Sequence, residues 1–192
     1  MNFLGHLLVS GTDPMTIVGN FMADGVKGRD LSRYPEGLEK GIRMHRQIDS
    51  YTDGHPLTLQ GRERLRAHCG KYAGVALDLF YDHAIAQRWE DLSDEPLKRF
   101  TRRMYNLLTA HIDLMPERAQ RMLPFMVQND WLGSYATMDG IGRALAGLSH
   151  RTPAGPLLAG AETVLEAHHL EFERECLLFI PQLRNHLNSF DA

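Results

Sequence analysis

Apolar residues recur at steps of three and four along almost the whole chain, which is the spacing of one face of an α-helix. The alternation of β-branched and polar residues that is typical of strands is missing. No internal repeat or low-complexity segment interrupts the pattern. The sequence therefore predicts an all-α fold. The expected helices cover residues 1–10, 16–26, 35–53, 57–69, 73–89, 95–112, 116–130, 131–148 and 161–188.

Proline and glycine mark the ends of several of these helices. Pro35 suits the first turn of the helix over 35–53, and Gly54 follows its end. HRTPAGP, residues 150–156, predicts a loop from its Pro and Gly content. Pro181 removes a backbone donor from the last helix and is expected to kink or divide it.

The length of 192 residues predicts one domain, a single helical bundle over residues 1–192. With 43% apolar and 23% charged residues, the chain has enough apolar material for a core. Its net charge of −3 argues against a general polyanion binder, and no nucleic-acid motif is present. An acidic partner would need a local basic patch.

Several features indicate a cytoplasmic protein. The two cysteines, Cys69 and Cys176, are far apart and fit a reducing compartment. MNFLGHLLVSG at residues 1–11 is short and has no preceding basic residue, so it predicts a first helix rather than a signal peptide. No run of about 18 apolar residues exists, so no membrane span is expected. Nothing in the sequence indicates an oligomeric state.

Carboxylate and imidazole groups interrupt the apolar faces of the expected helices. Over 35–53, the stripe that begins with Leu38 and Ile42 continues with His45 and Asp49. An ionised carboxylate on an inward face is costly unless a cation lies opposite. His45 and Asp49 can reach a common ion, because residues four apart lie on the same face of a helix.

The same interruption occurs in two other helices. Asp82 lies in the inward stripe of residues 73–89, with Asp78 one turn before it and His83 directly after it. Asn20 and Asp24 repeat the four-residue step in the helix over 16–26. A hard divalent metal can hold converging carboxylates, and imidazole extends the choice to Mn²⁺, Fe²⁺ or Zn²⁺. The expected metal pocket is formed by Asp24, His45, Asp49, Asp78, Asp82 and His83.

A purely structural role remains open for each of these residues taken alone, because helical Asp is usually solvated. Asp53 precedes Gly54 and is expected to organise the turn there. His6 is expected to be a packed core histidine. No phosphate-binding loop, dinucleotide fingerprint or serine-nucleophile motif is present.

Basic side chains form two clusters and one isolated candidate. Arg62, Arg64, Arg66 and Lys71 form the first cluster, and Lys98, Arg99, Arg102 and Arg103 form the second. Such clusters are usually solvated faces, but they can also attract an acidic protein. Arg46 directly follows His45, about 100° around the same helix.

Five segments together resemble the acyl carrier protein phosphodiesterase family, also called holo-acyl-carrier-protein hydrolases. The segments are MNFLGHL (1–7), GNFMADGVKG (19–28), GIRMHRQID (41–49) followed by YTD (51–53), LDLFYDHAIAQRW (77–89) and AHHLEFE (167–173). The resemblance implies a divergent, all-helical HD-domain-like fold. It also implies removal of 4′-phosphopantetheine from the serine of holo-acyl carrier protein, with Mn²⁺ or Mg²⁺. The histidines of the expected pocket leave Fe²⁺ as a further option.

Carried over by position, the resemblance assigns the metal site to Asp24, His45, Asp49, Asp78, Asp82 and His83. The HD pattern has an adjacent His-Asp pair, whereas this chain has Asp82-His83 in reverse order. A non-ligand group, Asp24 or His83, is expected to move protons. Arg46 is expected to bind a non-bridging phosphate oxygen.

Two other functions are compatible with the same residues. One is an HD-like phosphohydrolase that acts on a nucleotide or another small phosphate ester. The other is a non-catalytic helical module that binds acyl carrier protein without hydrolysing it.

Overall fold

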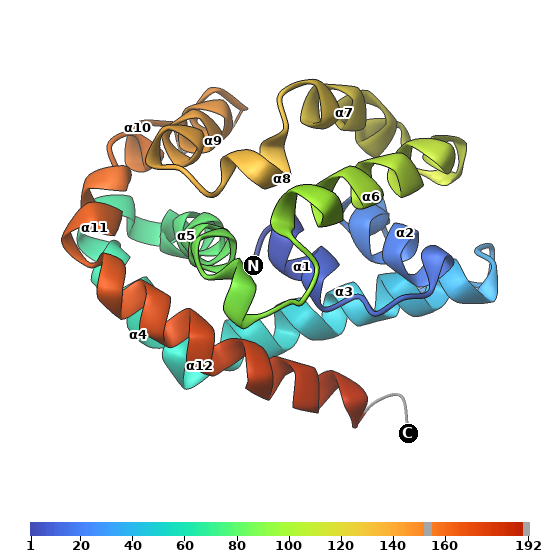
Figure 1. Ribbon diagram of the computed structural model, residues 1–192, viewed down its shortest axis with the longest axis horizontal. Coiled ribbons are helices and arrows are strands. Elements are labelled where there is room, and N and C mark those ends of the chain that lie inside the picture. Colours follow the sequence, from blue (N-terminus) through green and yellow to red (C-terminus); the bar gives the residue numbers. More distant parts are fainter. Residues whose placement is uncertain (152–154, 190–192) are drawn as a thin grey trace.

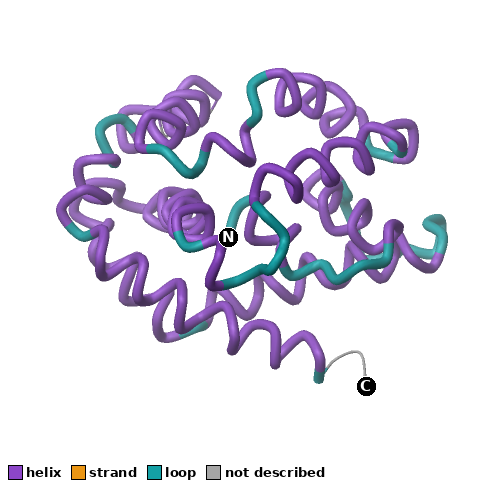
Figure 2. The backbone as a smooth tube through the Cα atoms, in the orientation of Figure 1, coloured by secondary structure: helices purple, strands orange, loops and turns teal. Residues whose placement is uncertain are grey.

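The computed structural model describes residues 1–151 and 155–189, and every regular element within those ranges is helical (Figure 2). The expectation of an all-α fold is confirmed. No helix in the described ranges is both long and apolar enough to span a membrane.

The longer helices correspond to the sequence pattern, and short 3-10 turns join several of them. The α-helices are α1 (Phe3–Leu8), α2 (Pro14–Met22), α3 (Glu36–Gly54), α4 (Pro56–Cys69), α5 (Ala73–Gln87), α6 (Leu97–Ala110), α7 (Glu117–Gln128), α8 (Trp131–Ser134), α9 (Met138–Arg151), α10 (Gly155–Leu158), α11 (Glu162–Ala167) and α12 (His169–Asn188). The 3-10 turns are η1 (Ala23–Gly25), η2 (Gly70–Tyr72), η3 (Trp89–Asp91) and η4 (Ile112–Leu114).

Three boundary expectations need correction. Pro181 lies inside α12 without dividing it, and the break in the expected helix over 161–188 falls at His168, between α11 and α12. The expected loop over 150–156 is shorter than predicted, because α9 extends to Arg151 and α10 begins at Gly155; residues 152–154 lie outside the described residues. Asp24 lies in η1, because α2 ends at Met22.

The apolar helix α5 is the centre of one half of the molecule, and the pair of α2 and α3 belongs to the other half (Figure 1). Helices α4, α9 and α12 pack against α5, and α1 connects α5 to the pair formed by α2 and α3. Helix α2 begins where the Asp13 carboxylate accepts the Thr16 backbone N–H at 2.7 Å, and Pro14 occupies the first turn. Residues Leu4, Ile17 and Ile42 from these three helices are fully or almost fully buried.

Two glycines allow α2 and α3 to touch through their backbones. A methyl group on Gly19 would overlap the Leu38 carbonyl oxygen, and one on Gly41 would overlap the Thr16 carbonyl oxygen. The Cβ position of Gly41 also lies 2.8 Å from the Gly19 Cα atom. A side chain at either position would force the two helices apart.

We expect Gly41→Ala to lower the free energy of unfolding by about 1–3 kcal/mol or more, because the added methyl group overlaps backbone atoms that cannot rotate away. Gly147→Ala is the matched control, because a Cβ atom there meets nothing within 4 Å. The control should be neutral or stabilising by about 0.5–1 kcal/mol. Urea unfolding of both variants measures the difference, and equal effects would contradict the close contact of α2 with α3.

Candidate functional site

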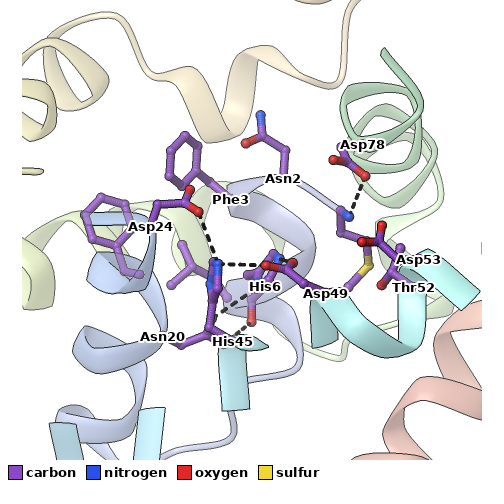
Figure 3. Close-up of a pocket in the computed structure, with 13 residues that line it drawn as sticks. Asn2, Phe3, His6, Asn20, Asp24, His45, Asp49, Thr52, Asp53 and Asp78 are labelled. Atoms are coloured by element: carbon purple, nitrogen blue, oxygen red, sulfur yellow. Dashed lines mark hydrogen bonds and ion pairs between the residues drawn. The ribbon is translucent and has the colours of Figure 1, made fainter. Parts of the chain in front are cut away.

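A polar cavity of about 270 Å³ opens where α1, α2, η1, α3 and α5 meet (Figure 3). Its walls include the side chains of His6, Asn20, Asp24, His45, Asp49 and Asp78. Four carboxylates in total line it, since Asp53 contributes as well. An uncompensated cavity of this kind repels anions and attracts cations.

Two histidines and one aspartate meet at the floor of this cavity. His6 Nε2 lies 3.2 Å from Asp49 Oδ1, and His45 Nε2 lies 3.1 Å from Asp49 Oδ2. The potential ligand atoms of these three residues all lie within 4.8 Å of one another. Both imidazoles are buried, whereas the side chain of Asp49 is 47% exposed and faces the cavity.

A single amide oxygen accepts hydrogen bonds from both rings. His6 Nδ1 and His45 Nδ1 each lie 3.0 Å from Asn20 Oδ1. The Asn20 Nδ2 group donates to Ser10 Oγ at 2.7 Å and to the His6 carbonyl at 3.3 Å, which fixes the orientation of the amide. Asn20 thereby places a proton on each Nδ1 and leaves each Nε2 directed at a carboxylate.

In this arrangement the ring nitrogens of His6 and His45 face more oxygen acceptors than two neutral imidazoles can satisfy. A neutral imidazole has one donor and one acceptor nitrogen, yet every nitrogen here faces an oxygen acceptor. Protonating both rings would place two positive charges face to face, because the centroids of His6 and His45 are 4.2 Å apart. A divalent cation beside the two Nε2 atoms and Asp49 would remove both conflicts, so the donor set fits a metal such as Mn²⁺ or Fe²⁺.

Without a metal ion, His45 holds an added proton more strongly than His6 does. Burial acts to lower the pKa of His45, but hydrogen bonds to Asp24 and Asp49 outweigh it and raise the pKa to about 9. Burial and the neighbouring His45 lower the pKa of His6. Burial opposes ionisation of Asp49, yet its hydrogen bonds with His45 and His6 keep its pKa far below the usual range.

Asp24 approaches the same cluster from the outer side. Its Oδ1 lies 3.3 Å from His45 Nε2, and its side chain is 65% exposed. The hydrogen bond from His45 lowers the pKa of Asp24, so the carboxylate stays ionised. The position suits either an additional ligand or a proton acceptor at the cavity mouth.

Two further carboxylates line the cavity but already have cationic partners. Asp78 Oδ1 lies 2.8 Å from the amino group of Met1. Asp53 forms an ion pair with Arg62. The structure thus brings Asp78 to the predicted pocket, outside the group of three potential ligands.

Asp82 and His83 do not join the predicted pocket, which corrects the expectation that six residues converge. Both Asp82 oxygens accept backbone N–H groups at the start of α1, from Asn2 at 3.2 Å, Leu4 at 2.7 Å and Gly5 at 3.0 Å. His83 Nδ1 donates to the Tyr135 carbonyl at 2.7 Å. Asp82 points inward because it caps the start of α1. His83 points inward because it links α5 to Tyr135, the residue that follows α8.

Arg46 is also differently placed from the expectation that it binds phosphate. Its guanidinium donates to the Gly28 carbonyl at 2.8 Å and to the Val26 carbonyl at 3.5 Å. These bonds hold the loop after η1 against α3. Arg46 therefore holds backbone in place, and it does not line the cavity that contains the histidine pair.

His6 and Asn20 are the site residues whose roles the sequence did not reveal. His6 lies in the apolar run MNFLGHLL and looked like a core histidine. Its ring does pack against His45, but its Nε2 reaches the cavity. The four-residue step from Asn20 to Asp24 was the available signal, since it places an amide on the face that carries the carboxylate.

Comparison with known proteins gives a consistent result. A family model described as acyl carrier protein phosphodiesterase matches residues 1–183. A protein of that name from Photorhabdus laumondii subsp. laumondii is 32% identical over 184 residues, covering 95% of this chain and 93% of the relative. Its counterpart from Klebsiella pneumoniae strain 342 is 33% identical over 184 residues, covering 95% of each chain. No solved structure matches significantly, so the HD-like aspect of the fold stays a prediction.

We expect Asn20→Leu to remove the shared acceptor and leave two buried Nδ1–H groups without a partner. The free energy of unfolding should fall by about 1–3 kcal/mol. In ¹⁵N NMR spectra of the histidine rings, the signals of His6 and His45 should lose the Nδ1–H form seen in the wild type. Asn106→Leu, at an exposed position of α6, is the control. Unchanged ring signals in Asn20→Leu would contradict the proposed role of the amide.

We also expect a pH dependence of stability in buffer that contains EDTA. The pKa of His45 rises from its ordinary value of 6.5 to about 9 in the folded protein, so its protonation stabilises the fold fully below pH 6.5. That stabilisation should disappear as the pH increases through about 9. Urea unfolding of wild type and His45→Gln across this range gives the test, and an identical pH slope in both would refute the raised pKa.

Proposed function

Because the chain belongs to the acyl carrier protein phosphodiesterase family, we propose that it hydrolyses the phosphodiester that joins 4′-phosphopantetheine to a serine of holo-acyl carrier protein. The products are apo-acyl carrier protein and 4′-phosphopantetheine. We further propose that the reaction depends on a divalent metal ion held by His6, His45 and Asp49. The observation that carries the metal proposal is the pair of Nε2 atoms that face one carboxylate in a polar cavity.

The donor set favours particular metals. Two imidazole nitrogens with one or two carboxylate oxygens suit Mn²⁺ and Fe²⁺ better than Mg²⁺, which prefers oxygen alone. Asp24 is the proposed additional oxygen donor or proton acceptor, because its carboxylate already reaches His45. The cytoplasmic location remains a prediction from the sequence.

The charge of the cavity supports this assignment. A phosphodiester is an anion, and it would have to enter a cavity lined by four carboxylates. A bound divalent cation would offset this repulsion, and it would supply an activated water for attack on phosphorus. The anionic substrate and the acidic cavity are therefore compatible once a cation is present.

The residues of the chain have separate tasks in this proposal. His6 and His45 present their Nε2 lone pairs, and Asn20 holds both rings in that orientation. Asp49 lies at the Nε2 edges of the two stacked rings and directs one carboxylate oxygen toward each of them. Asp24, at the exposed side, is placed to accept the proton of the attacking water. The P–O bond to serine then breaks, and the serine oxygen takes up a proton.

We expect purified protein with Mn²⁺ to release 4′-phosphopantetheine from holo-acyl carrier protein, followed as a loss of mass from the carrier. EDTA should stop the release, and added Mn²⁺ should restore it. Asp49→Asn should lower kcat/KM at least about a hundredfold and weaken Mn²⁺ binding, because it removes a charged oxygen donor. Asp94→Asn, at an exposed acidic position, should behave as wild type.

The same assay separates the competing functions. Release that persists in EDTA after thorough dialysis would contradict the metal proposal alone. Hydrolysis of free nucleotides without release from the carrier would replace the proposed substrate. A stable complex with the carrier and no hydrolysis would indicate a binding module.

A further inference from the structure

Ion pairs neutralise much of the basic surface that the sequence suggested for an acidic partner. In α4, Arg62 pairs with Asp53, Arg64 with Glu175 and Arg66 with Glu63. In α6, Glu95 pairs with both Arg99 and Arg103. A guanidinium with a carboxylate beside it contributes little to the attraction of a distant acidic surface. The first predicted cluster is therefore a poor docking surface.

Several exposed basic residues have no ion pair in the described part of the chain, and three of them lie near the cavity. Lys27, Arg29 and Arg118 are exposed, and none forms an ion pair with another residue in the described part of the chain. We call these three residues the basic rim. Lys27 and Arg29 belong to the loop between η1 and α3, and Arg118 lies in the first turn of α7.

Packing places the basic rim beside the cavity on the side of Asp24. Asp24 lines the cavity and lies three residues before Lys27. Turn η1 packs against α7, and the Cβ position of Gly25 lies 3.0 Å from Pro116 Cβ, two residues before Arg118. The two segments that carry the basic rim therefore converge at η1.

The loop that carries Lys27 and Arg29 is fixed rather than free. The Arg46 guanidinium binds the carbonyls on either side of Lys27, those of Val26 and Gly28. Val26 is buried, so the backbone is held from both sides. A fixed loop presents its charges without the entropy cost of ordering them on binding.

We propose that the basic rim is the docking surface for the acidic carrier protein, at the Asp24 side of the cavity. This inference rests on the proposed function and adds the place and orientation of the partner. The phosphodiester is attached to the carrier surface by a serine, so the carrier must sit directly at the cavity mouth. Positive charge at that mouth offsets the repulsion between an acidic protein and the acidic cavity.

The test uses two double variants with the same change of charge. Lys27→Glu/Arg29→Glu reverses two charges of the basic rim. Lys71→Glu/Arg174→Glu reverses two exposed basic residues, in η2 and α12, that also have no ion pair in the described residues. Figure 1 shows α12 on the opposite side of the molecule from α7. Circular dichroism and thermal unfolding establish that both variants are folded.

The measurements are the Kd for apo-acyl carrier protein, which lacks the phosphodiester, and KM and kcat for the holo form. We expect the variant of the basic rim to raise Kd and KM at least about tenfold with kcat nearly unchanged. Lys71→Glu/Arg174→Glu should change Kd and KM less than about twofold, because its charges lie away from the cavity mouth. Arg118→Glu alone should act in the same direction as the first variant, and salt should weaken wild-type binding more than binding by that variant.

The outcomes keep this inference separate from the proposed function. Equal Kd values in the two double variants would overturn the docking surface, even if the wild type hydrolyses the holo form. A wild type that binds the apo form through the basic rim but releases no phosphopantetheine would overturn the function and leave the docking surface supported. A tenfold loss of kcat at unchanged Kd would also overturn docking, because it would place these residues in the chemistry.

Discussion

The close contact of α2 with α3 at Gly19 and Gly41 is the constraint on which the site depends. Helix axes with side chains between them usually lie 8–10 Å apart. Here a Cβ atom on either glycine would overlap a backbone carbonyl of the other helix. The contact brings Asn20, one residue after Gly19, within hydrogen-bond distance of His45, one turn after Gly41. A wider separation of the two helices would break the hydrogen bond between His45 Nδ1 and the Asn20 side-chain oxygen, which orients the imidazole.

The buried hydrogen-bond network around Asn20 can be arranged in one way that gives every donor and acceptor a partner. The Asn20 amide has its nitrogen committed to Ser10 and to the His6 backbone, so its oxygen must face both histidine rings. The rings must in turn face Asp49, and only an added positive charge satisfies both. The raised pKa of His45 and the lowered pKa of His6 are the response of the protein without metal to this demand. The proposed metal ion would meet the same demand, because it would lie beside both Nε2 atoms and Asp49.

Two polar residues, Asp82 and Arg46, support the site without lining its cavity. Asp82 accepts the backbone N–H groups at the start of α1, and α1 carries His6. Arg46 holds the loop that follows Asp24. Loss of Asp82 or Arg46 would therefore disturb the site through displacement of other residues. The same loop carries Lys27 and Arg29, so the element that fixes one wall of the cavity also presents the proposed docking charges.

The sequence by itself determined the all-α class and most helix positions, because helical periodicity is a local property. It also indicated the family, through the resemblance of five segments, and it singled out Asp24, His45 and Asp49, which line one cavity in the structure. Only the tertiary structure separated these three from Asp82 and His83. An inward-facing carboxylate looks the same in sequence whether it caps a neighbouring helix or lines a cavity. The roles of His6 and Asn20 were equally hidden, because they arise where α1, α2 and α3 meet, and the direction of a side chain across such a contact depends on packing between segments distant in the chain.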